Sequence, residues 1–311
     1  MTSATMPDAI VDSHHHLWDL ARGRYPWLQD AYDPAHFLLG AYEALRRDFM
    51  PEHYRAACEG LPVVATVHVE AERARAEALA ETAWLHEVSA RSAMPHAVVA
   101  WVDLLAADAE ARLAEQAADT LVRGVRFKPT TSATPAQSVR DQPGALQDPR
   151  WPDGLARLQR HGLSWDLRVP FWHLEEAATL VCQAPGLAVA LNHVGLPWDR
   201  SPSGLEVWRR GMTALAACGN VHVKLSELGL RDAPWNVADN VRIIREVVDI
   251  FGWQRCMFGS NFPVASLRIG YRALVQATGE ALAPLTAKQR RAIWQDNALR
   301  FYRISMSTPG A

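Results

Sequence analysis

The sequence contains little cysteine, and its cysteines form no pattern typical of a metal or redox motif. No C-x-x-C pair occurs in the chain. Each cysteine lies in or near an apolar segment, where free cysteine behaves as a small hydrophobic residue. We therefore expect four reduced, buried thiols at Cys58, Cys182, Cys218 and Cys256.

Membrane, targeting and nucleic-acid signals are also missing. No apolar run reaches the ~18 residues that a membrane-spanning helix needs, and the first residues, MTSATMPDAI, lack the basic and apolar regions of a signal peptide. The formal net charge is −2, and no run of lysine or arginine indicates binding to nucleic acid or to an anionic membrane. These absences predict a cytoplasmic protein that acts on a small molecule; whether it forms a homo-oligomer stays open.

The chain does contain short, β-branched-rich apolar runs that alternate with segments of helical periodicity. The expected strands are residues 9–16, 63–71, 97–105, 122–129, 164–170, 187–195, 221–229 and 256–264. Helical patterns fill much of the intervening chain, at 71–91, 108–119 and 236–252, and one more follows the eighth strand at 286–304. Strands that alternate with helices pair in parallel through right-handed crossovers.

Eight such units in 311 residues predict an α/β protein with one domain, a (β/α)₈ TIM barrel. The domain spans 1–311, with an expected disordered tail at 1–8 and another tail at 305–311. The alternative is an open doubly wound sheet, but no G-x-G-x-x-G loop follows the first strand. The connections at 17–60 and 130–150 are unusually long, so we expect both on the catalytic face, where they would set specificity.

Polar residues stand near the C-terminal ends of these strands, often two positions apart and therefore on one face. The sets are Asp12, His14 and His16; His68 and Glu70; Arg126 and Lys128; Asp166 and Arg168; His193; Lys224 and Ser226; Ser260 and Asn261. Charges facing the helix layer would lose hydration at a large cost. We therefore expect these sets to converge in the barrel mouth, where such enzymes keep their active sites.

Each set also has a purely structural interpretation. His193 alone could be a hydrogen-bonded core histidine, and Arg126 with Lys128 could pair with Asp166 at the bottom of the barrel. Alternation turns His15 away from its two neighbours, which predicts a structural role for that ring. The shared position at strand ends favours the functional interpretation for the others.

Twelve tryptophans are many for this length, and several of them follow strand ends. These are Trp18, Trp27, Trp172, Trp198 and Trp235. Ordinary loop packing explains most such residues, but some should line the pocket and favour a ring-bearing or apolar substrate. We expect Trp18 and Trp172 to contact the substrate.

Six segments in order, DSHHHLWD, GVRFKP, LNHVGLPWDR, VKLSELG, MFGSNFPV and DNALRFYRI, resemble the amidohydrolase-related barrel hydrolases of the lactonase group. This group includes sugar-acid lactonases and 2-pyrone-4,6-dicarboxylate hydrolase. The resemblance runs from about residue 9 to residue 304 and implies that His14, His16 and His193 belong to the active site. The family's eighth strand carries an aspartate that acts as general base and, in metal-bound members, as a ligand; here the position is Asn261.

An amide cannot accept a proton at neutral pH and is a poor metal ligand beside a carboxylate. The resemblance thus leaves the cofactor open between none and one divalent metal such as zinc, held by His14, His16 and His193. Without a metal, His193 or His16 is the candidate base, with Glu70 and Asp12 as alternative carboxylates. Arg126 and Lys128 would bind an anionic group or stabilise an oxyanion, and Glu227 is a charge near the mouth with no assigned role.

The resemblance implies hydrolysis of a lactone or related cyclic ester or amide of a small, anionic substrate, by histidine-assisted attack of water. The catalytic residues are expected to be His14, His16, His193 and Asn261. The substrate contacts are expected to be Arg126, Lys128, His68, Arg168, Lys224, Ser226, Trp18 and Trp172. The alternatives are a non-hydrolytic enzyme, such as a lactone isomerase or decarboxylase, and a barrel that binds a small molecule without turning it over.

Overall fold

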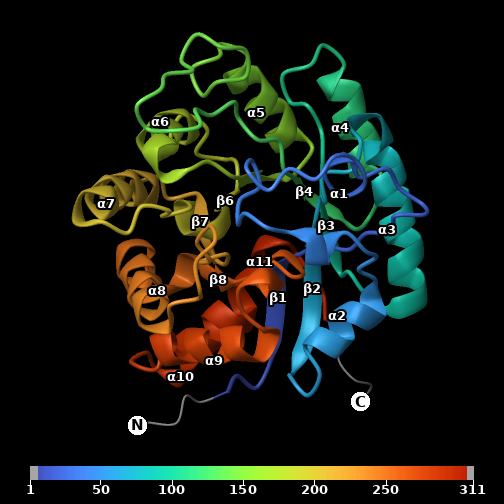
Figure 1. The fold of residues 1–311 in the computed structure, drawn as a ribbon. Helices are drawn as coiled ribbons and strands as arrows, with labels where there is room; N and C mark the ends of the chain where they lie inside the picture. Colours follow the sequence, from blue (N-terminus) through green and yellow to red (C-terminus); the bar gives the residue numbers. More distant parts are fainter. Residues whose placement is uncertain (1–5, 307–311) are drawn as a thin grey trace.

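Eight parallel strands form the centre of the computed structural model, which describes residues 6–306 (Figure 1). Every strand lies within a segment predicted from the sequence. They are β1 (Ile10–His15), β2 (Val63–Val69), β3 (Ala97–Ala100), β4 (Val122–Val125), β5 (Ser164–Leu167), β6 (Val189–Leu191), β7 (Val221–Leu225) and β8 (Cys256–Phe258). Most are shorter than predicted, because the polar residues at their ends leave the strand and enter loops.

The strands close into a barrel in chain order, from β1 to β8. Backbone hydrogen bonds join the ends of the first and last strand regions: His16 donates to the Phe262 carbonyl at 2.8 Å, and Asn261 donates to the His14 carbonyl at 2.7 Å. The single-domain (β/α)₈ barrel is therefore confirmed, and the open doubly wound alternative is wrong. The same two bonds hold His14, His16 and Asn261 at one seam.

Helices surround the ring of strands (Figure 1). Those between the strands are α1 (Pro26–Gln29), α2 (Pro51–Ala57), α3 (Ala78–Ser92), α4 (Ala109–Ala117), α5 (Trp151–Arg160), α6 (Leu174–Val181), α7 (Pro202–Ala217) and α8 (Val237–Phe251). After β8 follow α9 (Tyr271–Leu282), α10 (Ala287–Arg291) and α11 (Asn297–Phe301). Local signals fix several starts: the Asn236 side chain accepts from the Asp239 N–H at 3.0 Å and caps α8.

The barrel interior is filled by small and β-branched side chains from opposite strands. Val67 and Val69 of β2 pack in one cluster with Ala190 of β6 and with Phe301 and Tyr302 at the end of α11. Burial on both sides favours apolar side chains in such strands. β1 nevertheless contains Asp12, Ser13 and His14, and β5 contains Asp166, all of them buried. Polar groups at and beyond the C-terminal ends of the strands build the site described below.

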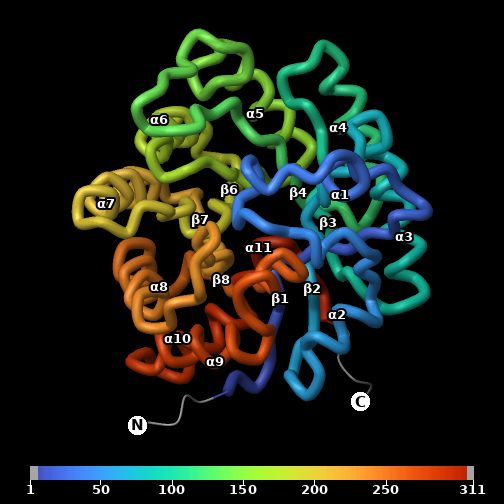
Figure 2. The backbone as a smooth tube through the Cα atoms, in the orientation of Figure 1, coloured from blue at the N-terminus to red at the C-terminus, as the bar shows by residue number. Residues whose placement is uncertain are grey.

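The two long connections differ in what they contribute. The segment after β1 crosses over the ring of strands, as the tube in Figure 2 shows, and it carries Trp27, His36, Phe37 and Leu38 to a cavity at the mouth. The segment at 130–150 contributes no residue to that cavity. The first connection is thus the one placed to contact a substrate.

The expectation of four reduced cysteines is wrong for two of them. Cys182 and Cys218 form a disulfide with Cα atoms 5.2 Å apart, while Cys58 and Cys256 are free and buried. Cys182 directly follows α6 and Cys218 directly follows α7. These helices pack side by side, so two cysteines 36 residues apart in the sequence lie close together in space.

Two further expectations concern the ends of the chain and the membrane. The predicted tails at 1–8 and 305–311 lie largely outside the described residues. Within residues 6–306, no helix is long and apolar enough to span a membrane.

Candidate active site

A cavity of about 280 Å³ opens at the C-terminal ends of the strands. Six of the predicted site residues line it: His16, Arg126, Lys128, Arg168, His193 and Asn261. The remaining lining residues are Trp27, His36, Phe37, Leu38, Ala71, Glu72 and Val264. The cavity therefore combines imidazoles, cations and an amide with an aromatic wall, in which the Trp27 and Phe37 rings stack at 5.5 Å.

Three imidazoles gather beneath and beside this cavity. The ring centroid of His14 lies 5.1 Å from that of His16 and 4.6 Å from that of His193. Burial lowers the pKa of all three well below the usual value, and nearby cations act in the same direction: Lys224 on His14, Arg126 on His16 and Arg168 on His193.

His193 is held with one nitrogen toward the cavity. Its Nδ1 lies 2.9 Å from the Ser226 hydroxyl, which is also 3.5 Å from the Lys224 carbonyl. When Ser226 donates to that carbonyl, it accepts from Nδ1–H, and the neutral ring then carries its lone pair on Nε2. Ser226 does not line the cavity, so the predicted substrate contact is instead a partner of His193.

Asn261 connects His16 to a buried carboxylate. His16 Nδ1 lies 2.7 Å from the Val69 carbonyl and Nε2 lies 3.1 Å from Asn261 Oδ1. Asn261 Nδ2 donates to Glu227 Oε2 at 2.5 Å. Burial raises the pKa of Glu227 to about 7, while the hydrogen bond from Asn261 opposes this. Sequence analysis gave Glu227 no role; the structure makes it part of the site.

Backbone strain accompanies these residues. His193, Glu227 and Asn261 all lie in the left-handed region, with φ of 57°, 43° and 55°. Residues other than glycine and asparagine rarely adopt this conformation, and it collects at functional sites because the surrounding fold must hold it. The three residues follow β6, β7 and β8, and the last two of them are in hydrogen-bond contact.

Strand alternation predicted that Asp12 shares the face of His14 and His16, but this prediction is wrong. A register shift in β1 between Asp12 and His15 breaks the alternation. The carboxylate instead accepts from the Tyr54 hydroxyl at 2.7 Å and from the Ser260 backbone and hydroxyl at 2.8 and 2.6 Å. It fastens β1 to β8 and α2, so Asp12 and Ser260 are structural, and Asp12 is no candidate base.

His68 also faces away from the mouth. Its Nδ1 accepts from the Leu17 N–H at 3.1 Å, and its Nε2 lies 3.6 Å from Glu81 on α3. The prediction failed because Val67 and Val69 occupy the inward positions of β2. His15 packs 4.7 Å from the Tyr54 ring, on the helix side, as predicted.

Lys224 lies inside the barrel and does not line the cavity. It forms a fully buried ion pair with Asp166, whose other oxygen accepts from the Tyr302 hydroxyl at 3.0 Å. The ammonium also lies 3.4 Å from His14 Nδ1. Because an ammonium can only donate, His14 carries its proton on Nε2, an atom with no hydrogen-bond partner among the described residues.

The cations of the cavity are only partly neutralised. The Arg126 guanidinium donates to the Glu70 carboxylate at 2.7 Å and to the Glu70 backbone carbonyl at 2.6 Å. Lys128 pairs with Glu72. Neither pairs with Asp166, so the barrel-bottom alternative is wrong. Glu70 also accepts from Arg75 at 3.1 Å; these cations hold its pKa at about 2 despite burial, which makes it a poor base.

The Arg168 side chain makes no hydrogen bond or ion pair with any residue between 6 and 306. Burial and the neighbouring Arg126 lower the pKa of its guanidinium to about 10, and burial and Arg168 lower that of Lys128 to about 7. Crowded cations of this kind favour an anionic ligand, and a guanidinium can bind a carboxylate through two hydrogen bonds.

The two tryptophans expected to contact the substrate are loop-packing residues. Trp18 is buried against Trp27 and Phe49 and donates to the Arg47 carbonyl at 2.6 Å. Trp172 packs against Trp198 and donates to Ser132 at 3.0 Å. A buried indole N–H needs an acceptor, and the loops supply it away from the cavity. Trp27 is the tryptophan on the cavity wall.

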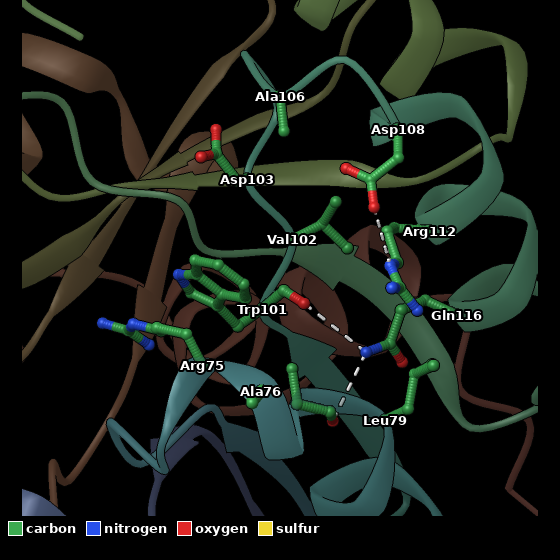
Figure 3. Close-up of a pocket in the computed structure, with 11 residues that line it drawn as sticks. Arg75, Ala76, Leu79, Trp101, Val102, Asp103, Ala106, Asp108, Arg112 and Gln116 are labelled. Atoms are coloured by element: carbon green, nitrogen blue, oxygen red, sulfur yellow. Dashed lines mark hydrogen bonds and ion pairs between the residues drawn. The ribbon is translucent and has the colours of Figure 1, made fainter. Parts of the chain in front are cut away.

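A second cavity of about 300 Å³ lies beside the first, between the loop after β3 and helices α3 and α4 (Figure 3). Three of its four charged residues are in ion pairs: Arg112 binds Asp108 at 3.1 Å, and Arg75, which stacks 4.7 Å from the Trp101 ring centroid, binds Glu70. The fourth, Asp103, accepts from the Leu105 N–H at 2.9 Å. Arg75 thus helps to hold Glu70, the carboxylate that binds Arg126.

The Glu70 pair should dominate the acid sensitivity of this region. Replacing Glu70 with glutamine is expected to destabilise the fold at pH 7 by about 3 kcal/mol, because Arg126 stays buried without its counter-charge. The folded pKa lies below the usual 4.5, so the contribution is present above that value and is lost as the pH falls toward about 2. Urea unfolding of both proteins between pH 7 and pH 2.5 measures this; a gap that does not narrow on acidification would contradict the assignment.

Comparison with known proteins identifies the family. The model of the family described as amidohydrolase matches residues 11–304. The chain belongs to the amidohydrolase family. It is a hydrolase, as the sequence analysis predicted. The imidazoles and cations described above lie at the mouth of its barrel.

Individual relatives cover nearly the whole chain. The protein y4mH of Sinorhizobium fredii is 33% identical over 95% of this chain and 99% of its own length. An L-fucono-1,5-lactonase of Burkholderia multivorans is 30% identical, over 94% of this chain and 96% of its own. A crystal structure of a Burkholderia multivorans amidohydrolase with bound zinc is 28% identical, with a TM-score of 0.79 over 96% of this chain and 100% of its own.

The residues of this chain do not fit such a metal. Among residues 6–306, no group of three or more histidine, cysteine, aspartate or glutamate side chains is placed to hold an ion. His16 Nε2 faces an amide oxygen, Asp12 is held at the seam, and Lys224 is 3.4 Å from His14. A divalent cation would add charge beside Arg126 and Arg168 with no facing carboxylate.

Proposed function

We propose that the protein opens the lactone ring of a small, anionic substrate by attack of water in the cavity at the barrel mouth. The unpaired guanidinium of Arg168 beside the free nitrogen of His193 carries this proposal. The lactonase named among the relatives supports the reaction, and the cations of the cavity support an anionic substrate.

The cavity provides a place for each part of the substrate. Arg168 binds the substrate carboxylate, and the stacked Trp27 and Phe37 rings pack against its apolar face. Arg126 and Lys128 also line the cavity, where they stabilise the negative charge that develops on the carbonyl oxygen.

His193 is the group that activates water. Its ring is neutral at pH 7 because burial and Arg168 lower its pKa, and Ser226 fixes the tautomer that presents the lone pair. Water transfers a proton to Nε2 as its oxygen forms a bond to the carbonyl carbon. Collapse of the tetrahedral intermediate breaks the bond to the ring oxygen, which must then be protonated.

A panel of lactones tests the proposal. We expect acid release, followed with a pH indicator, from lactones that carry a carboxylate, and slower release from neutral aldonolactones. The proposal would be overturned if the protein opened none of the carboxylated or aromatic lactones.

A cytoplasmic location and the absence of nucleic-acid partners stay predictions.

A further inference from the structure

Part of the aromatic wall of the cavity belongs to a segment without regular secondary structure. Phe37 and Leu38 line the cavity and lie within residues 34–38, here called the cap segment, none of which is in a helix or strand. Among the described residues, no backbone N–H donates to the carbonyls of Pro34 or Ala35. The position of the cap segment therefore depends on side chains that bind its backbone.

Arg231, in the loop after β7, is the side chain that binds this backbone. Its Nη1 donates to the Ala35 carbonyl at 2.5 Å and to the Pro34 carbonyl at 3.4 Å, and its Nη2 donates to the Phe37 carbonyl at 2.7 Å. A guanidinium carries its donors in one rigid plane, so a single side chain can bridge several acceptors. Every hydrogen bond that the Arg231 side chain makes within residues 6–306 goes to the cap segment.

The next residue along the chain, Leu39, is held independently of Arg231. Its side chain is fully buried, and its carbonyl accepts from the Arg268 guanidinium and from the Asp232 N–H at 3.3 Å. Arg268 also donates to the Leu230 carbonyl at 3.1 Å. Loss of the Arg231 side chain would therefore free the cap segment while the chain stays anchored at Leu39.

Phe37 connects the cap segment to the rest of the wall. Its ring lies 7° from parallel to the Trp27 ring, and its centroid is 4.4 Å from that of Tyr42. The Trp27 indole donates to the Ala71 carbonyl at 3.0 Å, so Trp27 has a polar anchor outside the cap segment. The Phe37 ring has no polar group, and its position follows the backbone that Arg231 binds.

The loop that carries Arg231 also contacts the polar part of the site. Glu227, which directly follows Ser226 after β7, accepts from the Asn261 amide at 2.5 Å, and Asn261 lines the cavity. One short loop thus binds both the end of β8 and the cap segment. This connection sets the distance between the polar residues of the cavity and the ring of Phe37.

We propose that Arg231 is a specificity-determining residue, which positions Phe37 so that the cavity prefers lactones that carry a flat apolar ring. This inference rests on the proposed function and concerns the part of the substrate that the cations do not bind. The substrate carboxylate binds Arg168, and the ring packs against Phe37 and Trp27. Arg231 does not line the cavity, so it acts through Phe37 as a positioning residue.

Kinetics with two carboxylated lactones tests this role. One is a carboxylated dihydrocoumarin, whose fused benzene ring can pack against the wall, and the other is a carboxylated δ-valerolactone, which has no such ring. Arg231→Gln is expected to raise KM about 10-fold for the dihydrocoumarin, because apolar burial of its ring is lost, and less than about 2-fold for the valerolactone. For both lactones kcat should change less than about 2-fold, since His193 and the cavity cations remain.

Arg231→Lys separates the bridging geometry from the charge. Lysine keeps the charge but offers a single nitrogen, which cannot reach the carbonyls of Ala35 and Phe37 in the way that a guanidinium does. Its KM values should therefore resemble those of Arg231→Gln. Hydrogen–deuterium exchange gives a direct readout: the amides of residues 35–38 should exchange faster in both variants, while those of the barrel strands stay unchanged.

Arg245→Gln is the matched control. Arg245 is also exposed and donates only to backbone carbonyls of a neighbouring element, those of Glu280 at 3.0 Å and Ala281 at 3.2 Å. It lies on α8 and does not line the cavity. The substitution should leave KM for both lactones unchanged.

The outcomes separate this inference from the proposed function. If the unmodified protein opens neither lactone, the proposed function fails. If it opens both, three results for Arg231→Gln would show that the role of Arg231 is wrong while lactone hydrolysis stands: an unchanged KM for the dihydrocoumarin, an equal rise in both KM values, or an equal fall in both kcat values. An Arg231→Lys variant with the KM values of the unmodified protein would also contradict the bridging role.

Discussion

Replacing His193 with glutamine is expected to lower kcat for lactone opening by about 10²–10⁴-fold, the range typical of a lost general base. The glutamine amide can still contact Ser226 but cannot accept the proton of water. KM should change little, since Arg168 and the aromatic wall remain. Steady-state kinetics with a carboxylated lactone measures both constants.

His222→Gln is a suitable control for this experiment. His222 lies on β7 and packs 4.9 Å from the Phe301 ring, outside the cavity. We expect it to retain kcat, which separates loss of the base from a general effect of replacing a partly buried histidine. Unchanged activity of the His193 variant would show that another group activates water.

Replacing Arg168 with glutamine is expected to raise KM about 10- to 100-fold for lactones that carry a carboxylate. Hydrogen bonds to a charged group contribute about 1.5–3 kcal/mol, and a two-point contact with guanidinium is lost. Because Arg168 has no partner among residues 6–306, the substitution breaks no ion pair, and stability should be preserved.

Neutral lactones are the internal control for Arg168. Their KM should change by less than about 3-fold, since the neutral amide still fills the same wall. Parallel kinetics on a carboxylated lactone and its methyl ester measure the difference. An equal rise in KM for both substrates would mean that Arg168 shapes the cavity without binding an anion.

The sequence was most informative where residues two positions apart were expected on one face. The H-x-H pattern separated His14 and His16 from His15, and the cations Arg126, Lys128 and Arg168 reached the cavity as predicted. In such cases a residue's face follows from its position in the strand. The eight strands themselves were predictable because each includes short apolar, often β-branched stretches that alternate with segments of helical periodicity.

Predictions failed where a local irregularity or a distant partner decides the orientation. The shift in β1 turns Asp12 toward Tyr54, and His68 accepts from the Leu17 N–H with its Nε2 on the side of Glu81. The rule that polar groups avoid the helix layer holds only when that layer offers no partner. Strand periodicity contains no information about such partners.

Glu227 shows a different limit. Its charge directly after the β7 strand, in SELG, was visible in the sequence, and Asn261 was recognised as unusual. Their connection was not visible, because it depends on two left-handed backbone turns that bring residues 34 positions apart into contact. Glu227 is a charge near the mouth, and Asn261 is uncharged where the family carries a carboxylate. Two such departures in one sequence indicate that the residues should be tested for direct contact.

The origin of the oxygen in the product tests lactone hydrolysis most directly. Mass spectrometry of the product formed from a carboxylated lactone in H₂¹⁸O should show the added mass of one water, with the label in the new carboxylate, because water attacks the carbonyl carbon. A product of unchanged mass, or one that has lost carbon dioxide, would contradict the account and indicate isomerisation or decarboxylation.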